Sequence, residues 1–190
     1  GFLSVQAMDR VSFYAIHDDT CEDLCQTVVG REAFYNAANM LNEVAFYGDG
    51  RSNMANSLIL AARLTGMELV IAAPAEERPD EKLMAGAGNI IWEADPVKAA
   101  AGVDYFYTDV WVSMGFEEEA KERMRILDPY RLDMATLLKA KPGAMVMHCL
   151  PAHRGEEITD DVMESPNSIV FDEAENRLHV QKAIMATLIK

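Results

Sequence analysis

The sequence predicts an α/β protein: a three-layer, Rossmann-like domain with a mainly parallel sheet of about five strands and helices on both faces. The first observation is that short, β-rich apolar runs alternate with segments of helical apolar spacing from residue 43 onward, which is typical of a parallel sheet covered on both faces. The second is size, because 190 residues of which 50% are hydrophobic supply one good-sized core rather than two full domains.

The expected strands follow one another along the chain, each bounded by turn residues. They cover residues 44–47, 67–73, 89–93, 105–110 and 144–149, with a further short strand at 168–171. Helices are expected over residues 53–64, from Asp95 and Pro96 onward, and over residues 117–127, 133–139 and 173–189. Gly66 ends the first helix, since glycine readily adopts the left-handed conformation that follows a helix. Asp95 caps the second helix, and Pro96 fits its first turn.

The long last helix is expected to be amphipathic. Its apolar residues on or near one face are Ala174, Leu178, Ala183, Ile184 and Leu188. Asp172, Glu173 and Glu175 enrich its first turns, where the helix dipole favours negative charge, so these three acids are interpreted as structural.

The first part of the chain does not share this pattern. Residues 1–44 contain nothing that resembles a phosphate-binding loop. From the change in composition, we expect the α/β domain to span residues 45–190. His17, Cys21 and Cys25 are spaced to share one helical face. Three ligands on one ridge cannot close a tetrahedral site without a fourth from elsewhere, so no metal is expected there.

Charge and composition exclude several classes of partner. A formal net charge of −14, from 31 acidic and 17 basic residues, disfavours a nucleic-acid partner, which requires a basic face. No apolar run approaches the length of a membrane span, so no membrane association is expected. Three cysteines do not make a disulfide framework, which indicates a reducing compartment and predicts a cytoplasmic location.

Polar side chains gather where the expected strands end, the edge at which parallel sheets bind ligands. They are Asp49 and Asn53 after the first strand, Asp109 and Ser113 after the fourth, His148 and Cys149 after the fifth, and Arg177 at the start of the last helix. The turn GDGRSN lacks the third glycine of a dinucleotide fingerprint, because Asn53 occupies that position, and this disfavours a nicotinamide cofactor.

Each of these residues also has a purely structural interpretation. Asn53 is either a helix cap or, at a helix N-terminus, a ligand for a carboxylate. Asp109 either caps the following turn or converges with Ser113 on an ammonium group. A lone buried cysteine such as Cys149 is usually an apolar filler, and a lone arginine such as Arg177 is usually a surface residue.

Three tracts together resemble one family. YTDVWVSMG at residues 107–115, HCLPAHRG at 148–155 and FDEAENRLH at 171–179 are similar to the ornithine-binding half of ornithine carbamoyltransferases. The resemblance implies catalysis of attack by the δ-amine of L-ornithine on carbamoyl phosphate, which yields L-citrulline and phosphate with no metal or organic cofactor. It also implies a homotrimer in complete family members.

The resemblance assigns roles to individual residues. Asn53 would take the α-carboxylate of ornithine, Asp109 and Ser113 would hold its α-amino group, and Met114 would contact it through the backbone. At the reacting end, Cys149 would lie beside the δ-amine, the backbone of Cys149 and Leu150 would face the carbamoyl group, and Arg177 would polarise the carbamoyl carbonyl. The implied catalytic residues are thus Asp109, Cys149 and Arg177. Ser52 departs from the family, which has asparagine there.

Family members also carry a domain that binds carbamoyl phosphate through the strings S-T-R-T and H-P-T-Q, and neither string occurs in the 190 residues. We therefore expect the chain alone to be weakly active or inactive. Family trimers are built largely through that domain, so the resemblance leaves the oligomeric state of this chain open. The alternatives are a non-catalytic ornithine-binding module and, less favoured, a dinucleotide-binding domain.

Overall fold

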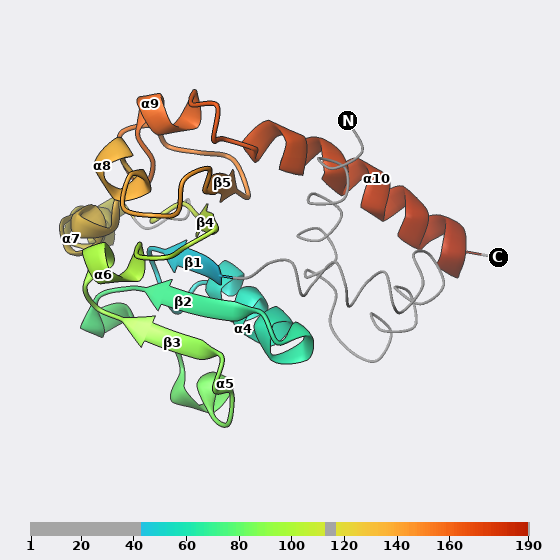
Figure 1. Ribbon diagram of the computed structural model, residues 1–190, viewed down its shortest axis with the longest axis horizontal. Coiled ribbons are helices and arrows are strands. Elements are labelled where there is room, and N and C mark those ends of the chain that lie inside the picture. The colour runs from blue at the N-terminus through green and yellow to red at the C-terminus, as the bar shows by residue number, and fades with distance from the viewer. Residues whose placement is uncertain (1–42, 113–116, 190) are drawn as a thin grey trace.

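A computed structural model describes residues 43–112 and 117–189 of the chain. These residues build one five-stranded, fully parallel sheet with the strand order β3-β2-β1-β4-β5, which confirms the predicted fold class (Figure 1). The strands are β1 (Glu43–Tyr47), β2 (Glu68–Ala72), β3 (Ile90–Glu93), β4 (Tyr105–Thr108) and β5 (Met145–His148).

Helices connect the strands, and two more follow the last strand. They are α4 (Asn53–Thr65), α5 (Glu81–Met84), α6 (Pro96–Ala99), α7 (Glu117–Leu127), α8 (Met134–Leu137), α9 (Asp160–Met163) and α10 (Val170–Leu188), with 3-10 turns η2 (Ala75–Glu77) and η3 (Asp128–Tyr130). The expected end of α4 is confirmed, since Gly66 adopts a left-handed conformation with φ of 75°. The cap of α6 is confirmed as well, because the Asp95 side chain accepts from the backbone N–H groups of Val97 and Lys98.

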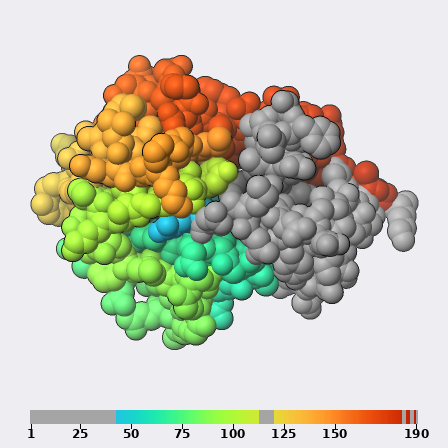
Figure 2. Space-filling view, in the orientation of Figure 1, coloured from blue at the N-terminus to red at the C-terminus, as the bar shows by residue number. Residues whose placement is uncertain are grey.

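Side-chain alternation along the strands produces a core on each face of the sheet. Ala45 and Tyr47 of β1 face the core that α6, α8 and α9 cover. Val44 and Phe46 of the same strand face the second core, which α4 covers. The molecule therefore has three layers, and the segments after residue 140 form its upper side in the space-filling view (Figure 2).

Two expectations about the end of the chain are wrong. The expected strand at residues 168–171 is only a single bridge between Ser168 and Val146, because the backbone enters α10 at Val170. The predicted apolar face of α10 is also wrong at Leu178, which is 52% exposed. Among the α10 residues whose side chains the structure describes, Val170, Glu173, Asn176 and Val180 pack inward.

The strand order sets the place of a ligand site. The chain builds β1, β2 and β3 to one side, then crosses over to place β4 next to β1 and β5 next to β4. In such sheets, the point where the order reverses leaves a crevice beyond the carboxyl ends of the two central strands. Here those strands are β1 and β4.

None of the helices in the described part of the chain has the length and apolar character of a membrane span.

Candidate functional site

A thiol and a carboxylate meet at the carboxyl edge of the sheet. Thr108 at the end of β4 pairs with His148 at the end of β5, so the residues that follow them, Asp109 and Cys149, leave the sheet side by side. The Cys149 Sγ donates to Asp109 Oδ1 at 2.8 Å. The same oxygen accepts from the Val110 backbone N–H at 2.8 Å. Two of the three predicted catalytic residues are therefore in direct contact.

The surroundings of Cys149 keep its thiol protonated. Burial is the largest cause that raises the pKa of Cys149, and the hydrogen bond to Asp109 with the negative charges of Asp109 and Glu173 adds to it. The positive charge of Arg177 opposes these effects without cancelling them. Cys149 is thus a neutral hydrogen-bond donor at physiological pH rather than a thiolate nucleophile.

Arg177 completes this cluster from α10. Its Nη2 donates to the backbone carbonyl of Cys149 at 2.9 Å, although the side chain is exposed. The residue after Cys149, Leu150, has a φ of 52°, a backbone conformation that residues other than glycine rarely adopt. Its N–H donates to His148 Nδ1 at 2.8 Å. The three predicted catalytic residues Asp109, Cys149 and Arg177 and the backbone of Leu150 thus form one cluster, which we call the thiol cluster.

The His148 side chain stabilises the turn that contains Leu150. Because Nδ1 accepts from Leu150, the proton must lie on Nε2, which approaches Glu157 Oε1 at 3.1 Å. Both side chains are fully buried. The same glutamate oxygen accepts from the His153 backbone N–H at 2.5 Å. These contacts favour the structural interpretation of His148, as a residue that orders the turn after β5.

From the sequence, Glu173 is only an acid in the first turn of a helix, where the helix dipole favours negative charge. It is 9% exposed. Its Oε1 accepts from the Tyr107 hydroxyl at 2.9 Å, and its Oε2 accepts from the His148 backbone N–H at 3.1 Å. The one signal in the sequence is its spacing of three from Val170 and from Asn176, which are also buried. Burial raises the pKa of Glu173 to about 7, although the bonds from Tyr107 and His148 oppose the rise.

The loop after β1 is fixed by other contacts. Ser52, not Asn53, caps α4 by accepting from the Ala55 N–H at 3.1 Å. Asn53 lies exposed in the first turn of that helix. Asp49 accepts from the Arg51 N–H at 2.8 Å. The amide of Asn53 is therefore not needed for the cap.

Asp49 belongs to a charge cluster centred on Arg123 of α7. The Arg123 guanidinium lies 2.7 Å from Asp49 Oδ2 and 3.0 Å from Glu77 Oε1, and its Nε donates to the Trp111 carbonyl at 3.0 Å. Burial first, and then the charge of Asp49, raise the pKa of Glu77, while Arg123 lowers it. Asp49 is thus held as a structural anion that ties β1 to the segments carrying Glu77 and Trp111.

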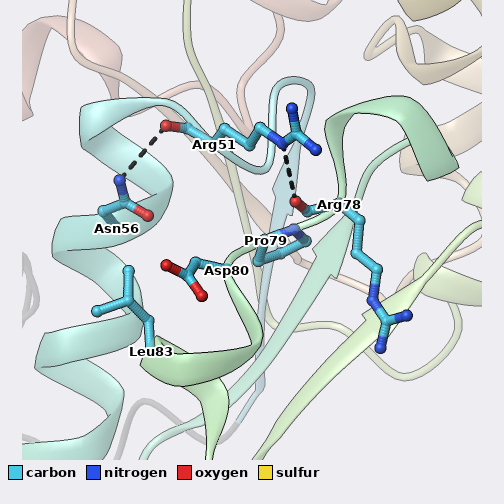
Figure 3. Close-up of a pocket in the computed structure, with 6 residues that line it drawn as sticks. All are labelled: Arg51, Asn56, Arg78, Pro79, Asp80 and Leu83. Atoms are coloured by element: carbon cyan, nitrogen blue, oxygen red, sulfur yellow. Dashed lines mark hydrogen bonds between the residues drawn. The ribbon is translucent and has the colours of Figure 1, made fainter.

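A pocket of about 480 Å³ opens beside the first turns of α4 (Figure 3). It is lined by Arg51, Asn56, Arg78, Pro79, Asp80 and Leu83. Arg51 Nε donates to the Arg78 carbonyl at 3.3 Å, while the Arg78 side chain points away from Arg51 and lies over the Trp92 ring at 4.7 Å. None of the lining residues belongs to the thiol cluster, so this pocket is separate from the predicted chemistry.

Ser113 and Met114, predicted to bind the amino-acid head, lie outside the described residues, as do His17, Cys21 and Cys25. Elsewhere His153, Glu156 and Glu157 place potential metal ligands within 4.8 Å of one another. His153 and Glu156 already form a pair at 3.4 Å, and Glu157 holds two hydrogen bonds. We interpret this group as an ion cluster that stabilises its loop.

Comparison with known proteins agrees with this geometry. The family model for the aspartate/ornithine carbamoyltransferase Asp/Orn-binding domain matches residues 42–188. The chain is 46% identical over 173 residues to an ornithine carbamoyltransferase of Methanoculleus marisnigri, covering 89% of this chain and 55% of the relative. It is 50% identical over 155 residues to that of Pyrococcus abyssi, covering 77% of this chain and 49% of the relative.

A solved structure shows the same fold. The ornithine carbamoyltransferase from Pyrococcus furiosus superposes with a TM-score of 0.72 at 44% identity, covering 82% of this chain and 56% of that one. The chain spans about half the length of the curated relatives it matches. The chain therefore belongs to the aspartate/ornithine carbamoyltransferase family, of which it carries the Asp/Orn-binding domain.

Proposed function

We propose that residues 45–190 are the ornithine-binding domain of an ornithine carbamoyltransferase, which transfers the carbamoyl group of carbamoyl phosphate to the δ-amine of L-ornithine. The observation that carries this proposal is the thiol cluster, in which Asp109 and Cys149 are 2.8 Å apart and Arg177 bonds the Cys149 carbonyl. Asp109 and Cys149 directly follow β4 and β5, and Arg177 lies on α10, at the edge of the sheet where ligands bind.

The α-amino acid head of ornithine would be held between β1 and β4. The Asp109 carboxylate supplies a charge-assisted partner for the α-ammonium, to which Ser113 and the backbone of Met114 would add neutral contacts. Asn53 stands exposed at the N-terminal end of α4, where a helix attracts a carboxylate. Because Ser52 caps this helix, the Asn53 amide is available for the α-carboxylate.

The reacting end would lie at the turn after β5. The δ-amine attacks the carbamoyl carbon and a C–N bond forms. The C–O bond to phosphate then breaks, and phosphate leaves with the bonding pair and takes up the proton that the amine loses. The protonated Cys149 thiol and the Leu150 backbone line this point, and Arg177 stabilises the negative charge that develops on the carbamoyl oxygen. The domain contributes orientation and electrostatic stabilisation rather than a covalent intermediate.

Carbamoyl phosphate requires a second set of contacts that residues 45–190 do not supply in this proposal. Loss of one such donor typically costs about 3 kcal/mol of barrier, roughly a hundredfold in rate. We therefore propose that the chain alone turns over poorly and that another domain or chain completes the site. The free thiol of Cys149 and the net charge of −14 support a reducing, cytoplasmic location with small-molecule substrates and no nucleic-acid partner.

Calorimetry with L-ornithine tests the proposal. We expect the chain to bind L-ornithine and Asp109→Ala to bind it about 30-fold or more weakly, since removing one partner of a desolvated charge pair costs 2 kcal/mol or more. Asp161→Ala, which removes an exposed carboxylate after β5, is the control and should bind as the wild type does.

Two further ligands sharpen the same experiment. Nα-acetyl-L-ornithine has no α-ammonium for Asp109 and should bind far more weakly than L-ornithine. NAD should not bind. Binding of NAD, or ornithine binding that survives in Asp109→Ala, would refute the proposed function.

A further inference from the structure

The buried Glu173 carboxylate lies where the three elements of the thiol cluster meet. It sits in the first turn of α10 and accepts one hydrogen bond on each oxygen, from the Tyr107 hydroxyl at 2.9 Å and from the His148 backbone N–H at 3.1 Å. Tyr107 belongs to β4 and His148 to β5. One side chain therefore joins two neighbouring strands to the helix that packs beside them.

Each of these contacts lies close along the chain to a predicted catalytic residue. Tyr107 is two residues before Asp109, His148 directly precedes Cys149, and Glu173 is one helical turn before Arg177. A shift of any one partner would move the corresponding member of the thiol cluster. The cluster depends on distances near 2.8 Å, so even a small displacement would break it.

We propose that Glu173 is a positioning residue of the ornithine site, whose ionised carboxylate holds β4, β5 and α10 together so that Asp109, Cys149 and Arg177 converge. Glu173 does not touch the substrate in this proposal. The inference rests on the proposed function, and it adds a regulation to that site: the geometry of the site depends on whether Glu173 is charged.

The chemistry of the two donors explains why charge matters. A carboxylate offers an acceptor to both donors, whereas a protonated carboxyl or an amide keeps one good acceptor and turns a donor toward the other partner. The Tyr107 hydroxyl is able to rotate and accept, but the His148 backbone N–H is not. The neutral form therefore keeps both partners only if the Tyr107 hydroxyl reverses its hydrogen bond. Neither remaining bond is then charge-assisted, so the neutral form joins the three elements more weakly.

The groups that face Glu173 place this change of charge in the neutral pH range. Burial raises the pKa of Glu173 to about 7, while Tyr107, His148 and Arg177 favour the charged form. Cys149 also faces Glu173 from the end of β5, and Asp109 acts on the Tyr107 hydroxyl that bonds Glu173. The Cys149 thiol stays protonated because its own pKa is raised. As the pH falls through about 7, Glu173 takes up a proton, and the charge-assisted bonds that join the three elements become neutral and weaker.

The test compares Glu173→Gln with Glu175→Gln. Glu175 is two residues along the same helix, exposed, and paired only loosely with His179 at 3.7 Å. At about pH 8 we expect Glu173→Gln to bind L-ornithine roughly tenfold more weakly, the usual effect of losing a charge-assisted hydrogen bond. Glu175→Gln should bind as the wild type does. Wild-type binding should weaken as the pH falls below about 7, and Glu173→Gln should show no such dependence.

Unchanged ornithine binding in Glu173→Gln at about pH 8, with the wild-type pH profile, would overturn the inference. Tyr107→Phe removes only one of the two donors and provides a second variant, for which we expect a smaller loss of affinity. Wild-type affinity in Tyr107→Phe would also count against the proposal.

A second measurement keeps this inference apart from the proposed function. If the wild-type chain binds no ornithine, the proposed function fails, and alkylation of Cys149 by iodoacetamide then decides the role of Glu173. The charge of Glu173 raises the pKa of Cys149, so Glu173→Gln should react severalfold faster at Cys149, followed by peptide mass spectrometry. An unchanged rate overturns the coupling between Glu173 and the thiol cluster.

Discussion

Replacing Glu173 with glutamine should change how the stability of the protein depends on pH. The folded state raises the pKa of Glu173 from 4.5 to about 7, chiefly by burial. Below about 4.5 this carboxyl is protonated in both states, so the stability associated with the raised pKa is fully present. That stability is lost as the pH rises through about 7, because the unfolded chain then gains more from ionisation than the buried group does.

The size of the effect follows from the displacement of the pKa. One pKa unit corresponds to about 1.4 kcal/mol, so the shift of Glu173 corresponds to roughly 3 kcal/mol of unfolding free energy. Glutamine does not titrate and lacks this loss. Relative to Glu173→Gln, the wild-type protein should therefore lose roughly 3 kcal/mol between about pH 4.5 and pH 8.

Urea unfolding at a series of pH values measures this difference. Subtracting the two proteins removes the contribution of every other titrating group, and Glu175→Gln, which alters an exposed carboxylate, serves as the control. A difference in unfolding free energy between wild type and Glu173→Gln that stays constant across the series would contradict the raised pKa of Glu173 in the folded state. Combined with ornithine binding, the result is diagnostic, because near pH 8 the glutamine variant should gain stability relative to wild type while it loses affinity.

Two further changes test the packing beside the site. A Cβ on Gly50 would lie 2.5 Å from the Glu77 carbonyl oxygen, so Gly50→Ala should lower the free energy of unfolding by about 2 kcal/mol. Gly88 has open space around it, so the control Gly88→Ala should change the free energy of unfolding by less than about 0.5 kcal/mol. Equal urea midpoints for the two variants would contradict this. Arg123→Met leaves the carboxylates of Asp49 and Glu77 without their shared cation and should cost about 2 kcal/mol at neutral pH, with partial recovery in acid as Glu77 protonates. A thermal midpoint of Arg123→Met equal to that of the wild type at neutral pH would contradict a stabilising role of this charge cluster.

The sheet could be predicted from the sequence because its signals are local. The five strands are short apolar runs, and each of their ends lies within two residues of the expected position. Gly66 and Asp95 marked helix ends through their own conformational preferences. Residues 168–171 were misassigned because β-branched residues start a helix here, and only Ser168 pairs with β5.

The site was predictable in part for the same reason. Asp109, Cys149 and Arg177 stand directly after strands or in the first turns of a helix, so their places follow from the order of elements alone. Glu173 could not be found this way. An acid in the first turn of a helix is ordinary on the surface, and only the packing of α10 against β5 shows that this one is buried between Tyr107 and His148.

The members of the thiol cluster are far apart along the chain, with a separation of 40 positions from Asp109 to Cys149 and of 28 positions from Cys149 to Arg177. Contacts of such long range form late in folding, since the intervening loops must close before the contacts repay the lost entropy. A partly folded chain in which β1, β2 and β3 have paired thus has most of its sheet but no thiol cluster. A ligand of this cluster would bind only chains in which β4, β5 and α10 have packed together. It would therefore stabilise the completed fold without accelerating the earlier pairing of β1, β2 and β3.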